Sequence, residues 1–213
     1  MRRVFIGSEA LAGGGLTRAA LRWNYRRLFP DVYVPCAISP SLRDRTLGAW
    51  LWSGRNGVIA GRAAAALHGA RWVDRQTPIE MIFRCGRPPP GIIVRNERLD
   101  GDEVTQVDGL LVTTVQRTAF DLARHRPRNE AVADLDALAQ ATGVKAVDVL
   151  ALAERYPGAR GTRRATTALG LMDAGAQSPR ETRLRLILVD EWLDPVRTQI
   201  KVTDGSTVAY LDM

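Results

Sequence analysis

The stretch from Thr113 to Arg126, TTVQRTAFDLARHR, predicts a helix in the middle of the chain. Thr113 or Thr114 can cap its start, because a threonine side chain accepts a hydrogen bond from a backbone N–H of the first turn. Arg117 and Asp121 stand four residues apart and therefore share one face of the helix. We expect them to form a surface or half-buried ion pair that contributes roughly a few tenths of a kcal/mol.

Short apolar runs bounded by turn residues predict two pairs of strands before this helix. The expected strands are Ile79–Phe83 and Gly91–Asn96 around a turn at Pro88-Pro89-Pro90, and Val104–Val107 and Leu110–Thr113 in a hairpin that turns at Asp108-Gly109. Further upstream, residues 61–69, GRAAAALHG, predict a helix whose alanines allow neighbouring elements to approach closely. His68 at its end is expected to be a packed or capping residue, because no metal-ligand spacing joins it to His125.

The pair GRAAAALHG and RTAFDLA, with strands between them, resembles the core of AbiEi-family antitoxins over about residues 55–126. The resemblance implies an antitoxin of a type IV toxin–antitoxin system, and it implies a mixed α/β core. A helical extension of three further helices is predicted at 129–141, 146–156 and 161–173. The acidic residues of this extension, Asp134, Asp136, Asp148 and Glu154, are expected on a solvated face.

The front of the chain predicts two short helices and a basic hairpin. Ser8 is expected to cap a helix that runs to Ala12 and ends at three glycines, and Thr17 to cap a second helix that runs to Trp23. The hairpin pairs residues 26–29 with 32–35. Residues 41–53, SLRDRTLGAWLWS, then predict an amphipathic helix with its apolar stripe at Leu42, Thr46, Leu47, Trp50 and Leu51.

Residues 16–35, LTRAALRWNYRRLFPDVYVP, resemble the small winged helix-turn-helix at the front of AbiEi-family antitoxins. In that fold the second helix enters the major groove of DNA and the hairpin contacts phosphates. The resemblance implies a DNA-binding surface made by Thr17, Arg18, Arg22, Arg26 and Arg27. The alternative is a helical hairpin that only packs on the residues after it.

The end of the chain predicts a helix followed by a hairpin. Ser178 can cap the helix, Pro179 suits its first position, and Glu181 can complete a capping box by accepting the N–H of Ser178. Leu184, Ile187, Leu188 and Trp192, widened by Leu186, Val189 and Leu193, predict a helix buried on most sides. Residues 198–202 and 207–211 then alternate around Asp204-Gly205, which predicts the hairpin.

This segment resembles the restriction-endonuclease-like, Vsr-like domain that follows an AbiEi-type front in many actinobacterial proteins. The matching residues are Ala159-Arg160-Gly161, Ser178-Pro179, Glu181, Leu184-Arg185, Pro195, Gln199 and Asp212. The resemblance implies that Glu181 and Asp212 are the first acids of a PD-(D/E)xK nuclease site, whose next strand is not present in this chain. One carboxylate holds Mg²⁺ poorly and such a site needs several converging ligands, so we expect Glu181 to cap its helix and the chain not to cut DNA.

Charge is distributed unevenly along the 213 residues. Residues 1–100 hold 16 arginines and 7 acidic residues, whereas residues 101–213 hold 14 basic and 16 acidic residues. A basic front half indicates a polyanionic partner there. Cys36 and Cys85 show no metal or disulfide spacing, and no apolar run approaches the ~20 residues of a membrane span. These features predict a cytoplasmic protein without a membrane segment.

Together these patterns predict an α+β protein in three parts. They are a winged helix-turn-helix at 1–40, an AbiEi antitoxin-like core with its helical extension at 41–175, and a truncated nuclease-like helix and hairpin at 176–213. The predicted function is DNA binding as an antitoxin-type transcriptional regulator, with DNA and a cognate toxin as partners and no cofactor. A Mg²⁺-dependent DNA endonuclease and an antitoxin that binds only its toxin are the alternatives. The oligomeric state stays open.

Overall fold

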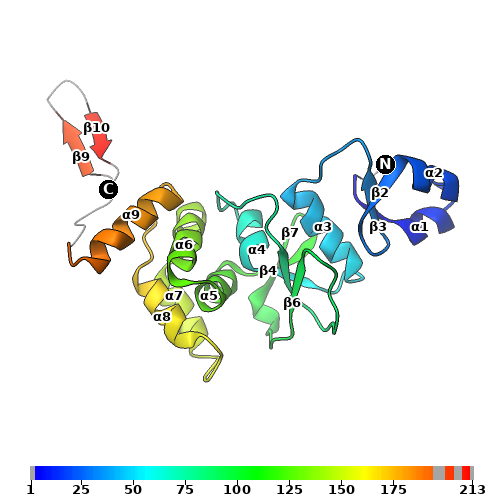
Figure 1. Cartoon of the computed structure of the whole chain (residues 1–213). Coiled ribbons are helices and arrows are strands. Elements are labelled where there is room, and N and C mark those ends of the chain that lie inside the picture. Colours follow the sequence, from blue (N-terminus) through cyan, green and yellow to red (C-terminus); the bar gives the residue numbers. More distant parts are fainter. Residues whose placement is uncertain (1–2, 194–199, 204–207, 212–213) are drawn as a thin grey trace. The chain divides into compact units, whose positions relative to one another are not determined.

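The computed structural model describes residues 3–193, 200–203 and 208–211. The chain forms two compact units, each described here by itself. The first contains residues 1–67 and 73–114, and the second contains residues 68–72 and 115–213. Helices and strands are mixed, as the predicted α+β class requires (Figure 1). Among the described helices, none has the length and apolarity that crossing a membrane demands.

A five-stranded sheet in the order β6-β5-β4-β8-β7 forms the centre of the first unit. Its strands are β4 (Val58–Ala60), β5 (Ile79–Ile82), β6 (Ile92–Arg95), β7 (Val104–Val107) and β8 (Leu110–Thr113). The hairpin of β7 and β8 is confirmed. A short 3₁₀ turn, η1 (Gly101–Glu103), leads into β7. One buried core contains the sheet residues Ile59, Ile79, Met81, Ile92, Leu110 and Val112.

Two features of this sheet differ from the prediction. Strands β5 and β6 form, but they run parallel instead of turning around the prolines. After β5 the chain runs back, so that β6 begins beside the first residue of β5. There the N–H of Ile79 donates to the Gly91 carbonyl at 2.9 Å. The central strand β4 was not predicted, because three apolar residues between two glycines are too short a run to show a period.

Helix α3 (Leu42–Trp52) packs against this sheet and also against a smaller one. Ser41 and Asp44 form a capping box at its start, with the Asp44 N–H donating to the Ser41 hydroxyl at 3.1 Å. The predicted stripe is too narrow, because Asp44 and Gly48 are buried as well as Thr46 and Leu51. Contacts on both sides of the helix explain the wider buried surface. Helix α4 (Gly61–Leu67) directly follows β4.

The smaller sheet has the order β1-β3-β2 and lies at the front of the chain. It contains β1 (Phe5–Ile6), β2 (Tyr25–Phe29) and β3 (Val32–Pro35), and it accompanies helices α1 (Gly7–Ala12) and α2 (Arg18–Asn24). The predicted order of helix, turn, helix and hairpin is therefore present. The predicted cap of α1 is wrong, because the helix already begins at Gly7 and Ser8 lies within it. The Ser8 hydroxyl donates a hydrogen bond to the Asp31 carboxylate at 2.5 Å.

The described residues of the second unit form five helices and a two-stranded hairpin (Figure 1). The helices are α5 (Val115–His125), α6 (Arg128–Thr142), α7 (Ala146–Ala153), α8 (Thr162–Gly170) and α9 (Pro179–Asp190). Helix α5 contacts α6, α7 and α8, so it is the central helix of this unit. Gly161, with a φ of 88°, precedes α8, and a Cβ there would lie 2.6 Å from the Arg124 carbonyl oxygen.

The face of α9 that packs is not the predicted one. Thr182, Arg185 and Leu186 are buried, whereas Leu184 is 45% exposed and Ile187 is 51% exposed. Thr182 and Arg185 both bond to a carboxylate of α6, so polar contacts rather than apolar periodicity select the buried side.

The terminal hairpin is confirmed as an antiparallel pair of β9 (Ile200–Thr203) and β10 (Val208–Leu211), with Thr203 opposite Val208. The predicted start of its first strand at Thr198, the turn at Asp204-Gly205, and Asp212 lie outside the described residues.

Candidate nucleic-acid interface

Helix α2 is held by one cap and one buried side chain. The Thr17 hydroxyl accepts a hydrogen bond from the Ala20 N–H at 3.1 Å, which confirms the predicted cap. Leu21 points into the core and is 9% exposed. The remaining surface of the helix is open, because Arg18, Ala19, Arg22 and Trp23 are all exposed.

The two arginines of this helix share one face. Arg18 and Arg22 are four residues apart, so their side chains lie one above the other. In the part of the chain that the structure describes, neither makes an ion pair with an acidic side chain. Their charges are therefore available to a ligand in solution.

Strand β2 carries the other two arginines of the predicted site. Arg26 lies opposite Val34 and Arg27 lies opposite Tyr33 in the hairpin with β3. Both side chains are exposed, and they leave the strand on opposite sides because neighbouring residues of a strand alternate. Arg26 donates to the Ile38 carbonyl at 3.1 Å. The structure thus places all five predicted contact residues on the surface of α2 and β2, and their role in binding stays a prediction.

The hairpin is fixed to α1 by Asp31 at its turn, a residue with a φ of 58°. The Asp31 carbonyl accepts the Gly7 N–H at 2.8 Å, and its carboxylate accepts the Ser8 N–H at 3.0 Å. Tyr33 fills the space beside Gly7, since a Cβ on Gly7 would lie 2.5 Å from its ring. Sequence analysis missed this contact, and the only signal for it was the Pro30-Asp31 turn itself.

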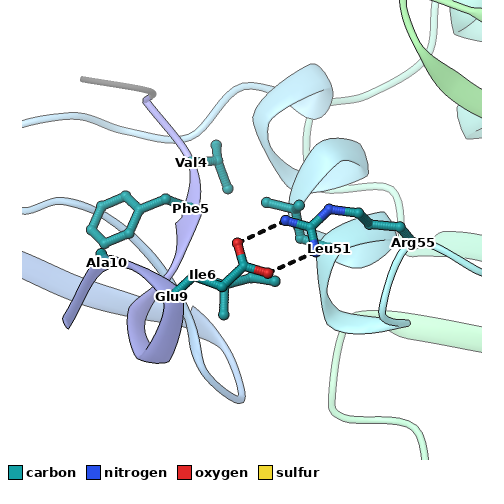
Figure 2. Close-up of a pocket in the computed structure, with 7 residues that line it drawn as sticks. All are labelled: Val4, Phe5, Ile6, Glu9, Ala10, Leu51 and Arg55. Carbon is teal, nitrogen blue, oxygen red and sulfur yellow. Dashed lines mark hydrogen bonds and ion pairs between the residues drawn. The ribbon is translucent and has the colours of Figure 1, made fainter. Parts of the chain in front are cut away.

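An ion pair joins α1 to the residues after α3. The guanidinium of Arg55 donates to both carboxylate oxygens of Glu9, at 2.7 and 2.8 Å (Figure 2). The hydrogen bond to Glu9 raises the pKa of Arg55 above its ordinary value. Val4, Phe5, Ile6, Ala10 and Leu51 line a pocket of about 290 Å³ beside this pair. Helix α1 is therefore held to the residues after α3 by a charged contact, beside a pocket lined by apolar side chains of β1 and α3.

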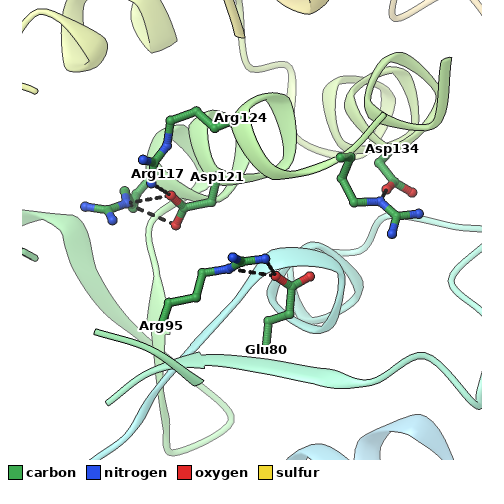
Figure 3. A network of polar contacts seen from close by, with 7 residues as sticks. Glu80, Arg95, Arg117, Asp121, Arg124 and Asp134 are labelled. Atoms are coloured by element: carbon green, nitrogen blue, oxygen red, sulfur yellow. Dashed lines mark hydrogen bonds and ion pairs between the residues drawn. The ribbon is translucent and has the colours of Figure 1, made fainter. Parts of the chain in front are cut away.

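A second group of charged side chains is buried in the second unit. Asp121 accepts hydrogen bonds from Arg117 Nε at 3.0 Å and from Arg124 at 2.7 Å (Figure 3). Arg117 is 0% exposed and also donates to the Tyr156 hydroxyl at 2.9 Å. Arg117 and Asp121 were predicted to form a surface or half-buried pair, but both side chains are buried, so the predicted exposure is wrong. Helices α6, α7 and α8 surround α5, so the same spacing that would make a surface pair lies inside the unit.

The predicted solvated face of acids is wrong for Asp136 and holds for Asp148 and Glu154. Asp136 is 1% exposed and accepts three hydrogen bonds, from the Asp173 N–H at 2.7 Å, the Thr182 hydroxyl at 2.8 Å and Arg185 at 2.8 Å. Burial raises the pKa of Asp136 above its ordinary value, and these donors together with the Arg185 charge act against that shift.

Asp134, also expected on the solvated face, bonds to Arg126 at 3.2 Å. In the first unit, Arg95 donates to Glu80 at 2.6 Å (Figure 3). The carboxylates of Asp134 and Glu80 therefore each accept a hydrogen bond from an arginine.

Glu181 performs a local structural role at the start of α9. Its carboxylate accepts the Gln177 N–H at 2.8 Å and the Ser178 hydroxyl at 2.7 Å, while the Ser178 hydroxyl accepts the Glu181 N–H at 3.3 Å. The predicted cap by Ser178 is confirmed. The backbone N–H that the Glu181 carboxylate accepts differs from the prediction. It belongs to Gln177, the residue before the cap, and not to Ser178. Asp212, the other predicted acid, lies outside the described residues.

Comparison with known proteins places these features in a family. The AbiEi antitoxin C-terminal domain matches residues 57–174, which include both GRAAAALHG and RTAFDLA. Two proteins of Mycobacterium tuberculosis, Rv2248 of strain H37Rv and MT2308 of strain CDC 1551, both described as uncharacterized, are 28% identical to the chain over 167 residues. The aligned part covers 78% of this chain and 60% of each relative, so the chain spans less than two thirds of their length. Because the matched domain covers more than half of the 213 residues, the chain belongs to the AbiEi antitoxin family.

Proposed function

We propose that this protein is a DNA-binding antitoxin that regulates transcription through α2 and the β2–β3 hairpin. The observation that carries the proposal is the set of four exposed arginines on these two elements, Arg18, Arg22, Arg26 and Arg27. Membership in an antitoxin family supports the same function. The resemblance of residues 16–35 to a winged helix-turn-helix supports DNA as the ligand.

The geometry of the front suits a duplex. A helix of α2's width fits the major groove, where side chains on its outer face reach base edges and phosphates. Basic side chains on a neighbouring hairpin can then neutralise phosphates beside that groove. Each neutralised phosphate releases condensed counterions, so binding by this surface should weaken as salt rises.

A cognate toxin protein is the second partner of this proposal. The family supports it, and the exposed apolar side chains Leu184 and Ile187 on α9 offer a surface for a protein contact. Co-expression with the product of the neighbouring gene, followed by purification of this chain alone and together with that product, tests the partner separately from DNA. Failure to co-purify with any neighbouring product would leave DNA binding as the whole function.

Arg26→Ala combined with Arg27→Ala should weaken binding to duplex DNA of any sequence. The two substitutions remove up to two phosphate contacts. The negative slope of log affinity against log salt should therefore become shallower by about 0.9 for each lost contact. Fluorescence anisotropy with a labelled random-sequence duplex, titrated at several salt concentrations, measures both quantities. Substitution of Arg18 or Arg22 by alanine should also change sequence preference if the side chain contacts a base.

The matched control is Arg163→Ala combined with Arg164→Ala. These arginines are also adjacent and exposed, but they lie on α8 in the second unit. The control changes the net charge by the same amount and should leave the salt slope unchanged. If both double variants lower affinity and slope equally, the front does not bind DNA through a defined surface.

We also propose that residues 176–213 are a nuclease-like remnant that does not cut DNA. A metal-dependent nuclease needs carboxylates that converge on Mg²⁺. The Glu181 carboxylate instead accepts two hydrogen bonds at the start of its own helix. No cofactor is proposed, and Mg²⁺ would be required only if the endonuclease alternative were correct.

Ser178→Ala should lower the stability of the second unit by about 1 kcal/mol, because α9 loses its cap. Glu181→Gln should cost less, since a glutamine oxygen can still accept the Gln177 N–H. Denaturant unfolding measures both losses, and calorimetry with Mg²⁺ tests for a metal site. The remnant hypothesis is refuted if Mg²⁺ binds the natural protein and supports DNA cleavage, while Glu181→Gln abolishes both and keeps the stability.

A further inference from the structure

The outer surface of α2 has an apolar row beside its basic row. Ala19 and Trp23 are four residues apart, as are Arg18 and Arg22, so two parallel rows run along the same exposed side of the helix. Trp23 is 77% exposed, although tryptophan carries one of the largest apolar surfaces of any residue. Among the residues that the structure describes, Leu21 takes the buried position of this helix and Trp23 stays mostly exposed.

The rows differ in what they can contact in a major groove. Guanidinium groups bond to phosphates and to guanine O6 and N7, whereas apolar side chains contact the 5-methyl group of thymine. Among the groups that distinguish base pairs in that groove, this methyl group is apolar, whereas the others donate or accept hydrogen bonds. A row of Ala19 and Trp23 therefore complements thymine.

We propose that Trp23, supported by Ala19, is a specificity-determining residue that recognises thymine methyl groups in the major groove of duplex DNA. The inference rests on the proposed DNA-binding function and adds that the preferred binding sites contain thymine. Arg18 and Arg22 hold the helix against the duplex, and Trp23 favours sites that place thymine beneath the C-terminal half of α2. Burial of the methyl group against the indole removes both apolar surfaces from water.

The test uses probes that differ in this methyl group alone. The natural protein is titrated with alternating dA-dT duplex and with the same duplex carrying uracil in place of thymine. Because a buried methyl group alters affinity about fourfold, the thymine duplex should bind at least about fourfold more tightly. Methylating C5 of the cytosines in an alternating dG-dC duplex should raise affinity in the same way.

Trp23→Ala should remove the preference for the methylated duplexes and leave the salt slope unchanged, since the arginines remain. Trp192→Ala is the matched control, because Trp192 is 94% exposed and lies in the second unit, so it should keep the preference. Circular dichroism of each variant checks that the fold is intact.

Four results would overturn the inference. Equal affinity of the natural protein for the thymine and uracil duplexes excludes a methyl contact while the proposed DNA-binding function stands. A thymine preference that persists in Trp23→Ala assigns the contact to another residue. Tighter binding to single-stranded oligo(dT) than to duplex, lost in Trp23→Ala, means that the indole stacks on unpaired bases instead. Absence of binding to every duplex refutes the proposed function itself, and the inference with it.

Discussion

Asp121→Ala should lower the free energy of unfolding of the second unit by about 3–5 kcal/mol. Asp121 forms ion pairs with two buried guanidiniums, those of Arg117 and Arg124, which are 0% and 3% exposed. Without this carboxylate, both positive charges stay inside the unit with less compensation. The loss is larger than that of a surface pair because neither arginine can regain water without disturbing α5.

Chemical denaturation followed by circular dichroism measures this loss, because the second unit is rich in helix. The two units can unfold in separate transitions, so the helical signal is fitted with two steps where the curve shows them. Asp190→Ala is the control, since Asp190 bonds to Arg128 at the surface of the same unit. It should leave the transition nearly unchanged. Equal effects of the two substitutions would contradict a structural role for the buried group.

Two helix caps and one hairpin turn of this protein could be predicted from short stretches of its sequence. Thr17 and Ser178 were predicted as caps, and both accept the backbone N–H that a cap must accept. The hairpin at Asp108-Gly109 was predicted from its turn for the same reason, because two residues decide the local backbone. These features could be predicted because a few neighbouring residues decide them, whereas the predicted Ser8 cap failed because Ser8 bonds to the distant Asp31.

Features that depend on distant residues could not. The spacing of Arg117 and Asp121 is identical on a solvated helix and on a buried one, so only the packing of α6, α7 and α8 on α5 reveals the burial. The apolar residues of α9 predicted one packed face, yet Arg185 is buried and Ile187 is exposed. Hydrophobic periodicity ranks arginine as polar and cannot anticipate a buried carboxylate partner on another helix.

The candidate site divides in the same way. The sequence predicted the cap of α2 at Thr17 and its basic residues, Arg18 and Arg22. The structure confirms the cap and places both arginines at the surface. The sequence predicted Leu16, Ala20 and Leu21 on the apolar side of this helix, and Leu21 is buried whereas Trp23 is exposed. The difference arises because only one side of this seven-residue helix packs on the rest of the first unit.

Asp136→Ala should cost the second unit about 3 kcal/mol or more at neutral pH, because Arg185 is left buried without its carboxylate. The Asp173 N–H and the Thr182 hydroxyl would each lose an acceptor as well. The loss should also depend on pH. Burial raises the pKa of Asp136 above 3.8, so between 3.8 and its folded pKa the folded state binds more protons than the unfolded state.

The sign of that dependence follows from this proton uptake. The contribution of Asp136 to stability is fully present below 3.8 and falls as pH rises through the folded pKa, so the loss in Asp136→Ala should grow as pH is lowered from 7 toward 4. Asp190 supplies a control of opposite sign. The hydrogen bond from Arg128 lowers the pKa of Asp190, so any loss in Asp190→Ala should shrink as pH falls through that lowered pKa. Denaturant unfolding of both variants and the natural protein from pH 7 to below 3.8 gives the two trends, because the Asp190 trend lies below the ordinary pKa of 3.8. A loss in Asp136→Ala that shrinks on acidification would mean that Arg185 and the two neutral donors outweigh burial, and that the pKa of Asp136 is lowered in the folded protein.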